Sequence, residues 1–158
     1  MARFILALSV ALGLALSHQA AWGQAAKKKR ARPAVNENVP APKDCPAKFE
    51  AYLERFENDF TFQVAVVRYP LPIAFMDDGV QIKDKLNKMQ YTKPRQPWYP
   101  TPALQSLWEL KKEVRTLSPT KRVVHFEQSD PESYSVDFHF QKSGTCWRLV
   151  FMDDRAPY

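Results

Sequence analysis

The fold of this chain is decided by residues 134–153, Tyr-Ser-Val-Asp-Phe-His-Phe-Gln-Lys-Ser-Gly-Thr-Cys-Trp-Arg-Leu-Val-Phe-Met-Asp. Residues 134–142 and 145–153 are rich in aromatic and β-branched side chains and predict two strands. Ser143-Gly144 fits a two-residue hairpin loop that pairs residue 142 with residue 145. The cross-strand pairs on one face are then large and apolar: Phe140 with Trp147, Phe138 with Leu149, and Val136 with Phe151. The stretch therefore predicts an antiparallel hairpin with an aromatic inner face.

The residues before this hairpin predict a mixture of helices and strands. Residues 49–56 place apolar side chains along one helical face, and residues 60–69 are β-branched or aromatic, as in a strand. A short helix is predicted near residues 84–89, a longer helix over residues 102–117, and a further strand over residues 121–128. The predicted fold class is α+β, with an N-terminal helix and a curved, mostly antiparallel sheet that ends in the hairpin.

The first 23 residues predict a cleavable secretory signal peptide. Arg3 supplies a positive charge, an apolar run follows over residues 4–16, and Ala21-Trp22-Gly23 places small residues at the cleavage positions before Gln24. The apolar run is shorter than the roughly 20 residues that a membrane-spanning helix needs. The chain is therefore predicted to be exported, to the periplasm or otherwise to the surroundings of the cell. The alternative is an N-terminal anchor that stays uncleaved.

The formal net charge of +6 comes from the N-terminal segment. Together with Arg3, five residues of one short run account for the whole excess of basic over acidic residues: Lys27, Lys28, Lys29, Arg30 and Arg32. Residues 24–44 therefore predict a basic, Pro-rich linker, and residues 45–158 a single domain. Basic and acidic residues are equal in number from residue 33 onward. The run is interpreted as a solvated spacer, with weak contact to a polyanion of the cell envelope as the alternative. No specific nucleic-acid binding is predicted.

Cys45 and Cys146 are the only cysteines, and they stand 101 positions apart. An even pair of cysteines in an oxidising compartment predicts a disulfide bond. The alternative is two ordinary thiols, one of them buried.

Candidate catalytic residues are few. His125, His139 and Asp137 could form a histidine base oriented by a carboxylate. The predicted register, however, puts Asp137 and His139 on the face opposite the aromatic one, with His139 across from Arg148. An exposed polar face or a dimer surface is the preferred interpretation. No phosphate-binding loop, nucleophile elbow or zinc-protease signature is present, and no cofactor or metal is predicted.

A Pro-rich loop over residues 93–102 carries Trp98 and Tyr99. These rings could line the mouth of an apolar pocket. The preferred alternative is a lid that packs on the core.

Two stretches also resemble a known family. Residues 62–71, Phe-Gln-Val-Ala-Val-Val-Arg-Tyr-Pro-Leu, after the predicted helix, and residues 134–150 are similar to the opening and the close of a family of uncharacterised bacterial exported proteins. That family belongs to the nuclear-transport-factor-two-like superfamily of cone-shaped α+β domains. The likeness covers residues 49–154 and implies the fold but no activity, because the superfamily contains isomerases, dehydratases and non-catalytic binding modules. Such domains often pair through the outer face of the sheet, which implies a homodimer.

The predicted function is that of an exported module that binds a protein or small-molecule partner without catalysis. The alternative is an enzyme of the isomerase, dehydratase or hydrolase kind, with a pocket inside the cone and His125, or Asp137 with His139, as its acid–base group.

Overall fold

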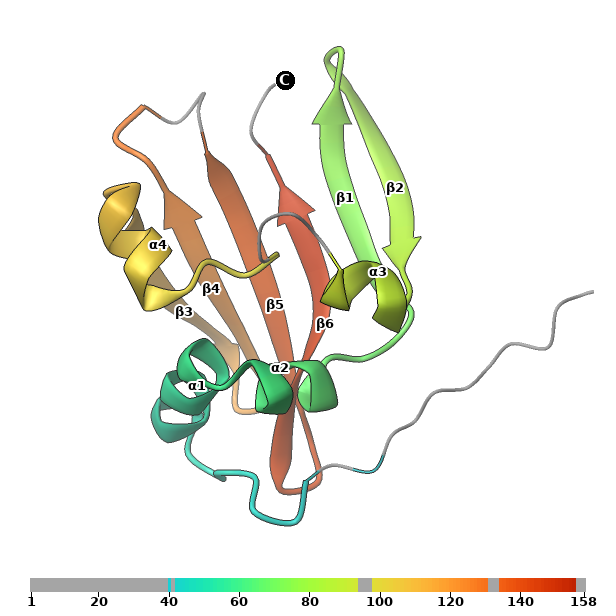
Figure 1. The fold of residues 1–158 in the computed structure, drawn as a ribbon, viewed down its shortest axis with the longest axis vertical. Coiled ribbons are helices and arrows are strands. Elements are labelled where there is room, and N and C mark those ends of the chain that lie inside the picture. The colour runs from blue at the N-terminus through green and yellow to red at the C-terminus, as the bar shows by residue number, and fades with distance from the viewer. Residues whose placement is uncertain (1–39, 41, 94–97, 131–133, 156–158) are drawn as a thin grey trace, which may run out of the picture. The chain divides into compact units, whose positions relative to one another are not determined.

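A computed structural model of the chain describes residues 40, 42–93, 98–130 and 134–155 (Figure 1). The chain divides into two units, Met1–Ala34 and Val35–Tyr158, and every described residue belongs to the second unit. The predicted signal peptide and the basic run therefore lie outside the described residues.

The described residues form one six-stranded sheet in the order β2-β1-β6-β5-β4-β3. The strands are β1 (Leu71–Asp77), β2 (Val80–Leu86), β3 (Lys111–Ser118), β4 (Lys121–Glu127), β5 (Ser135–Ser143) and β6 (Cys146–Asp154). β1 and β6 run parallel, whereas the other neighbouring strands are antiparallel. The predicted α+β fold with a curved, mostly antiparallel sheet is confirmed.

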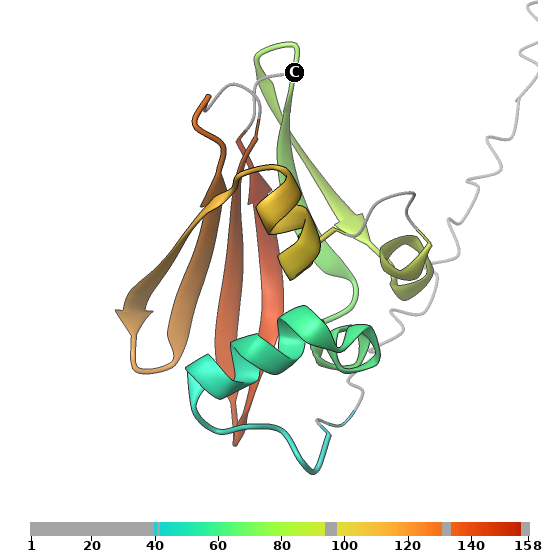
Figure 2. The ribbon, with the colours of Figure 1, turned by 60° about the vertical axis from the view of Figure 1, so that its left-hand side comes forward.

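The helices lie on one side of this sheet (Figures 1 and 2). They are α1 (Phe49–Asn58), α2 (Phe60–Val66), α3 (Lys88–Thr92) and α4 (Pro102–Leu107). The helix-covered side is called the inner face below, and the opposite side, which no described helix covers, is called the outer face. Strand residues alternate between the two faces, so that neighbours in sequence point to opposite sides.

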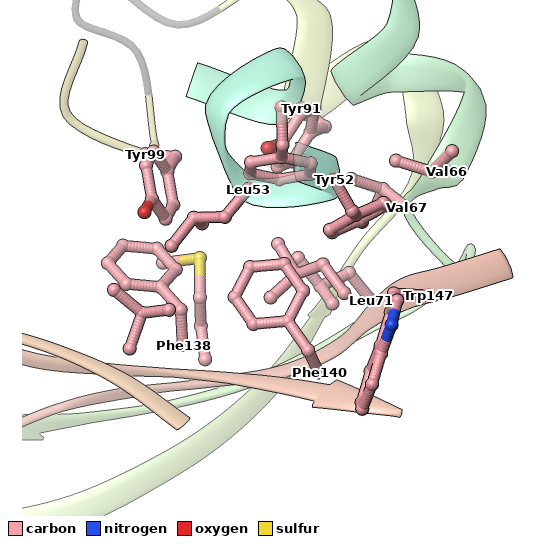
Figure 3. Packing of buried hydrophobic residues seen from close by; sticks show 14 of the residues in the cluster. Tyr52, Leu53, Val66, Val67, Leu71, Tyr91, Tyr99, Phe138, Phe140 and Trp147 are labelled. Carbon is pink, nitrogen blue, oxygen red and sulfur yellow. The ribbon is translucent and has the colours of Figure 1, made fainter. Parts of the chain in front are cut away.

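The inner face is packed with aromatic side chains (Figure 3). Phe140 of β5 lies with its ring centroid 5.6, 5.9 and 5.2 Å from those of three α1 residues, which are Phe49, Tyr52 and Phe56. Most of these ring pairs meet edge to face, the arrangement that the ring quadrupoles favour. The α1 residues are the apolar set predicted from helical spacing, and they are buried as expected.

The predicted Cys45–Cys146 disulfide is present in the structure, with the two Cα atoms 5.5 Å apart. It joins the segment before α1 to the first residue of β6, and Cys146 is fully buried. The bond therefore fixes the N-terminal entry of the domain to its last strand.

The hairpin forms, but in a different register from the predicted one. Ser143 pairs with Cys146, so the loop is Gly144-Thr145. Gly144 has a φ of +62° and occupies the first loop position, where a type II′ turn favours glycine. Closer to the middle of the strands, Phe140 pairs with Leu149 and His139 pairs with residue 151, so Val150 is an extra residue on β6.

This bulge changes which residues of β6 face the core. Beyond Val150 the alternation is shifted by one residue, as expected for a bulge. Met152 therefore packs inside at 5% exposure, and Phe151 moves to the outer face. The three predicted apolar pairs are therefore wrong: Phe140 pairs with Leu149, Phe138 with Met152 and Val136 with Asp154. The predicted position of His139 opposite Arg148 is wrong as well, since Arg148 pairs with Gln141.

The predicted strand over residues 60–69 is wrong, because its first part is helix α2. The carboxylate of Asp59 accepts a hydrogen bond of 2.9 Å from the backbone N–H of Phe62 and caps the helix. The helix buries Phe62, Gln63 and Val66 against the core. Packing of one helical face thus outweighs the β propensity of the segment.

Two predicted helices are present but have the wrong bounds. Residues 102–107 are helical, but the chain leaves the helix at Trp108 and Glu109, and residue 109 has a φ of +52°. Residues 111–118 then pair with β4 as the edge strand β3. Similarly, residues 84–86 belong to β2, and the predicted short helix begins after Asn87, whose side chain forms a capping box with Gln90.

Loss of the disulfide should lower stability by about 4 kcal/mol, because the bond closes a loop of about 100 residues in the unfolded chain. We expect the double variant Cys45→Ser with Cys146→Ser to unfold at a lower guanidinium concentration than the oxidised protein. Reductant should shift the wild type to the same midpoint and leave the variant unchanged. Equal midpoints for the oxidised and reduced wild type would contradict a stabilising bond.

Candidate functional site

The outer face carries the titratable residues that the sequence singled out. Val136 and Phe138 of β5 are buried on the inner face, so Asp137 between them points to the outer face. The prediction that Asp137 and His139 lie outside the aromatic interior agrees with this geometry. The expectation of an exposed face does not hold for Asp137, which is only 2% exposed.

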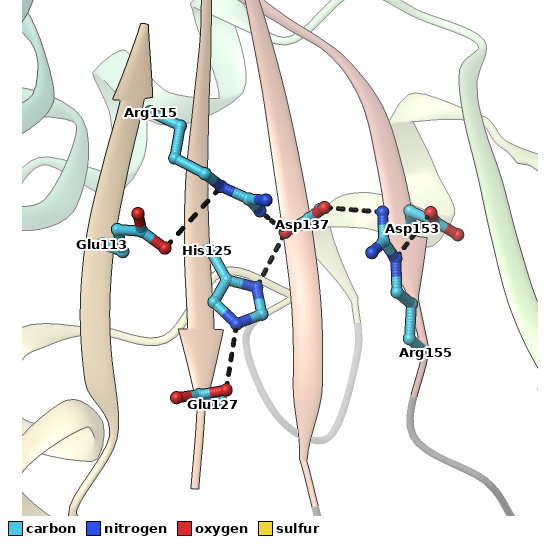
Figure 4. Close-up of polar contacts among 7 residues, drawn as sticks. All are labelled: Glu113, Arg115, His125, Glu127, Asp137, Asp153 and Arg155. Atoms are coloured by element: carbon cyan, nitrogen blue, oxygen red, sulfur yellow. Dashed lines mark hydrogen bonds and ion pairs between the residues drawn. The ribbon is translucent and has the colours of Figure 1, made fainter. Parts of the chain in front are cut away.

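Asp137 is buried because cationic and polar groups from neighbouring segments cover it (Figure 4). Its Oδ1 accepts from the guanidinium of Arg115 on β3 and lies 2.7 Å from Nδ1 of His125 on β4. Its Oδ2 lies 2.8 Å from Nη2 of Arg155, directly after β6. Both oxygens are thus engaged by donors, which offsets the cost of removing the carboxylate from water.

The partners of Asp137 contact further carboxylates at the rim of the cluster. Nε of Arg155 lies 3.0 Å from Asp153, and Nε of Arg115 lies 3.8 Å from Glu113. The result is a belt of alternating charges that crosses β3, β4, β5 and β6 on the outer face. We call it the charged belt, and it consists of Glu113, Arg115, His125, Glu127, Asp137, Asp153 and Arg155.

The ring of His125 is engaged on both sides. Nδ1 faces Asp137, and Nε2 lies 3.3 Å from Oε2 of Glu127. A catalytic histidine keeps one ring nitrogen within reach of the reacting proton. In the structure both nitrogens have carboxylate partners, and the contact with Asp137 joins β4 to β5.

His139 is separated from this belt. Its ring lies against that of Phe151, with the centroids 5.1 Å apart and the planes tilted by 47°. Its Nε2 is buried without a hydrogen-bond partner among the described residues. Burial lowers the pKa of His139 below the ordinary value of histidine, although Asp137 and Asp153 oppose the shift. The one-residue bulge that moves Phe151 to the outer face creates this contact.

On the inner face, Tyr99 fills the space between the helices and the sheet (Figure 3). It is completely buried, and its ring centroid lies 4.6 Å from Phe138 and 5.3 Å from Phe126. Its hydroxyl donates a 2.8 Å hydrogen bond to Glu57, which also accepts one from Lys112. Burial raises the pKa of Tyr99, so the phenol stays neutral.

Trp98 lies beside Tyr99 at the margin of the core. It packs against the core cluster and donates a 3.2 Å hydrogen bond from Nε1 to the backbone carbonyl of Gln90 in α3. This hydrogen bond joins Trp98 to α3.

The outer face also holds a hollow that sequence reasoning missed. It has a volume of about 470 Å³ and is lined by Pro40, Arg68, Gln141, Lys142, Ser143, Arg148 and Val150. We call it the basic pocket. Its residues come from separate segments of the chain, so no local sequence motif predicts it.

The described residues contain no group of three or more His, Cys, Asp and Glu side chains placed to hold a metal ion. Within the same described ranges, none of the helices has the length and apolar character needed to cross a membrane.

The helices packed inside a curved, mostly antiparallel sheet define the nuclear-transport-factor-two-like, or NTF2-like, α+β fold. In particular, the chain is similar to an NTF2-like protein from Bacteroides fragilis, with 18% sequence identity and a TM-score of 0.50. The match covers 73% of this chain and 50% of that chain, so it spans half of the neighbour's length. This likeness shows the fold alone.

A second solved structure is an NTF2-like protein of unknown function from Pseudomonas putida, with 14% identity and a TM-score of 0.34. It matches 70% of this chain and 82% of its own. No family model matches the sequence, and no curated protein matches it.

Replacing the central carboxylate of the charged belt should destabilise the protein. Asp137→Asn leaves Arg115 and Arg155 without their shared negative charge, and we expect the free energy of unfolding to fall by about 2–3 kcal/mol. The loss is smaller than for a fully buried ion pair, because both guanidinium groups are partly open to water. Glu113→Gln is the matched control, because Glu113 is 64% exposed and should contribute less than about 1 kcal/mol. Urea unfolding of the two variants measures both values, and similar losses would contradict the central role of Asp137.

His139 should make stability depend on pH. Because burial lowers its pKa in the folded state, the unfolded chain binds a proton more readily below about pH 6.5. This contribution to stability is complete above pH 6.5 and is lost as the pH falls below it. We expect the wild type to lose more stability between pH 7.5 and pH 5.5 than His139→Gln. Parallel curves of unfolding free energy against pH would disprove the effect.

Proposed function

We propose that this protein is an exported, non-catalytic binding module and that the outer face of its sheet contacts the partner. The NTF2-like fold is consistent with either a ligand-binding domain or an enzyme with a pocket inside the cone. The choice between these two classes depends on what occupies the inner face.

The observation that carries the proposal is the aromatic filling of the inner face (Figure 3). The side chains in this space are fully or almost fully buried and pack ring against ring: Phe56, Tyr99, Phe126, Phe138 and Phe140. Two more phenols in the core, Tyr52 and Tyr91, have pKa values raised well above the ordinary value by burial. They stay protonated at neutral pH and are poor bases.

The outer face supports the second half of the proposal. No described helix covers it, and it carries the charged belt, the basic pocket and exposed apolar side chains such as Leu117, which is 60% exposed. Charged rims with apolar patches are typical of surfaces that bind other molecules. A second copy of the chain, another protein and a small molecule are the candidate partners.

Export is supported by the sequence and is compatible with the disulfide. Residues 1–23 have the charge, apolar run and small residues of a signal peptide, and a disulfide persists in oxidising compartments.

The proposal is tested by native mass spectrometry of the full chain expressed with its own N-terminus and recovered, without reductant, from the exported fraction. We expect a species that begins near Gln24, is two hydrogens lighter than the reduced mass, and carries a partner that dissociates on activation. Doubling of the mass would identify the partner as a second copy.

Two matched substitutions locate the binding surface. Leu117→Asp places a charge on the outer face, and Leu107→Asp makes the same change on α4, where Leu107 is 74% exposed. We expect the first variant to lose its partner and the second to retain it. The reverse pattern would assign binding to the helix side, and a bare monomer in every preparation would overturn the proposal.

A further inference from the structure

Strand β3 forms one edge of the sheet and pairs, among the described strands, with β4 alone (Figures 1 and 2). Most of its side chains are exposed, among them Val114 at 46%. On the inner side, a hollow of about 530 Å³ lies between β3 and α1 and leaves room for the side chains of an added strand. Backbone N–H and C=O groups on the free side of an edge strand can pair with a further strand.

The charges on β3 could either prevent or favour such pairing. Edge strands are often protected by charged side chains and by bulges. β3 has a bulge between Thr116 and Ser118, which leaves residues 111–116 as its regular part. This part carries four charged residues, Lys111, Lys112, Glu113 and Arg115. Their effect on a second β3 strand depends on which residues face each other, because opposite charges across a strand pair attract and like charges repel.

Symmetry limits the possible partners of each residue. Two copies that pair antiparallel through β3 are related by a twofold axis perpendicular to the sheet, the usual symmetry of homodimers. Such an axis keeps inner side chains on the inner face, so each residue can face only a residue that points to the same side. Val114 points to the inner face, because its partner on β4, Val124, is in the core. Glu113 and Arg115 therefore point to the outer face.

Of the registers centred within the regular part, the one centred on Val114 brings opposite charges together. It places Glu113 of each copy opposite Arg115 of the other, and it places the two Val114 side chains side by side. A register centred on residue 113 or residue 115 would instead place identical charges at the axis. The register centred on Val114 also pairs Lys112 with Thr116, so no like charges face each other directly.

The other edge strand, β2, lacks a register of this kind. Its charged residues are Lys83, Asp84 and Lys85. Asp84 points to the opposite face from both lysines, since the side chains of a strand alternate. A symmetric pair of β2 strands therefore never places Asp84 opposite a lysine. The charge pattern favours β3 over β2 as a surface for a second copy.

Pairing through β3 also continues the charged belt from one copy to the next. Arg115 donates to Asp137, and its Nε is buried without a hydrogen-bond partner among the described residues. Glu113 is 64% exposed, and its carboxylate lies 3.8 Å from this Nε, beyond hydrogen-bond distance. A guanidinium group carries five N–H donors, so Arg115 can bind Asp137 of its own copy and Glu113 of the second copy together.

We infer that the protein forms a symmetric homodimer in which two β3 strands pair antiparallel around Val114. The two sheets then become one continuous sheet, with the helices of both copies on the same side. This pairing differs from the predicted homodimer through the outer face, because it uses the edge of the sheet and leaves the outer face open. It goes beyond the proposed function, since binding of a partner to the outer face does not require a second copy.

Sedimentation velocity of the full chain, recovered from the exported fraction and measured over a series of concentrations, tests the dimer. We expect a monomer–dimer equilibrium for the wild type. Val114→Lys and Val114→Asp each place like charges at the axis and should raise the dissociation constant of the dimer by about tenfold. An equimolar mixture of the two variants should recover the dimer, because opposite charges then meet at the axis.

Two further measurements control for folding and for general effects of charge. Val80→Lys adds the same charge to β2, where Val80 is 60% exposed, and should leave the dissociation constant unchanged. Hydrogen exchange of the wild type needs no variant. Amides of β3 that point away from β4 should exchange faster after dilution to the monomer, whereas the amides of β2 should exchange at the same rate at both concentrations.

Several outcomes would overturn the inference. They are a wild type that stays monomeric at every concentration, a dimer that Val114→Lys does not weaken, and a mixture of the two Val114 variants that stays monomeric. Exchange that changes on dilution in β2 rather than in β3 would also contradict it.

Native mass spectra separate failure of this inference from failure of the proposed function. A doubled mass that persists in Val114→Lys would refute the edge pairing and support a second copy on the outer face. A dimer that dissociates in Val114→Lys and carries no other partner would support the edge pairing and leave the proposed outer-face binding without support.

Discussion

The ring of Phe140 is the contact on which most of the domain depends. It contacts three aromatic rings of α1, and its ring centroid also lies 6.5 Å from that of Tyr99. Through these contacts β5, α1 and the segment before α4 share one core, and the disulfide holds the chain at the beginning of α1 to β6. Each helix here is too short to be stable on its own and needs its apolar face buried. Contacts with β5 therefore help to determine where α1 lies.

Filling the inner face with rings has a consequence for function. The space between the helices and the sheet is filled largely by aromatic side chains, with Glu57 bonded to Tyr99 and Lys112 beside them. The larger cluster of charged groups lies on the outer face. There, a buried carboxylate is tolerated because two arginines and a histidine from neighbouring segments surround it. The charged belt joins β3, β4, β5 and β6 across the face that has no helices. The same face carries the basic pocket, which Arg68 and Arg148 help to line.

Sequence reasoning reached part of the candidate site. Alternation along β5 was enough to place Asp137 and His139 on the outer face, because alternation is a local property of a strand. The environment of these residues was not predictable in the same way. Arg115 comes from a segment expected to be helical, and Arg155 follows the last strand, so neither was recognised as a partner of Asp137. Arg68 was assigned to the end of a strand, and its meeting with Arg148 depends on a bridge between Val67 and Leu149.

The sequence alone determined the α+β class, the helical face of α1, the hairpin and the pairing of the two cysteines. Each depends on local periodicity or on residue counts. Only the tertiary structure decided the register of the hairpin, the helix at residues 60–66, the edge strand at residues 111–118 and the filled inner face. Val150 shows the reason: one extra residue reverses which side chains of β6 face the core, and the loop geometry and packing that select it come from both strands together.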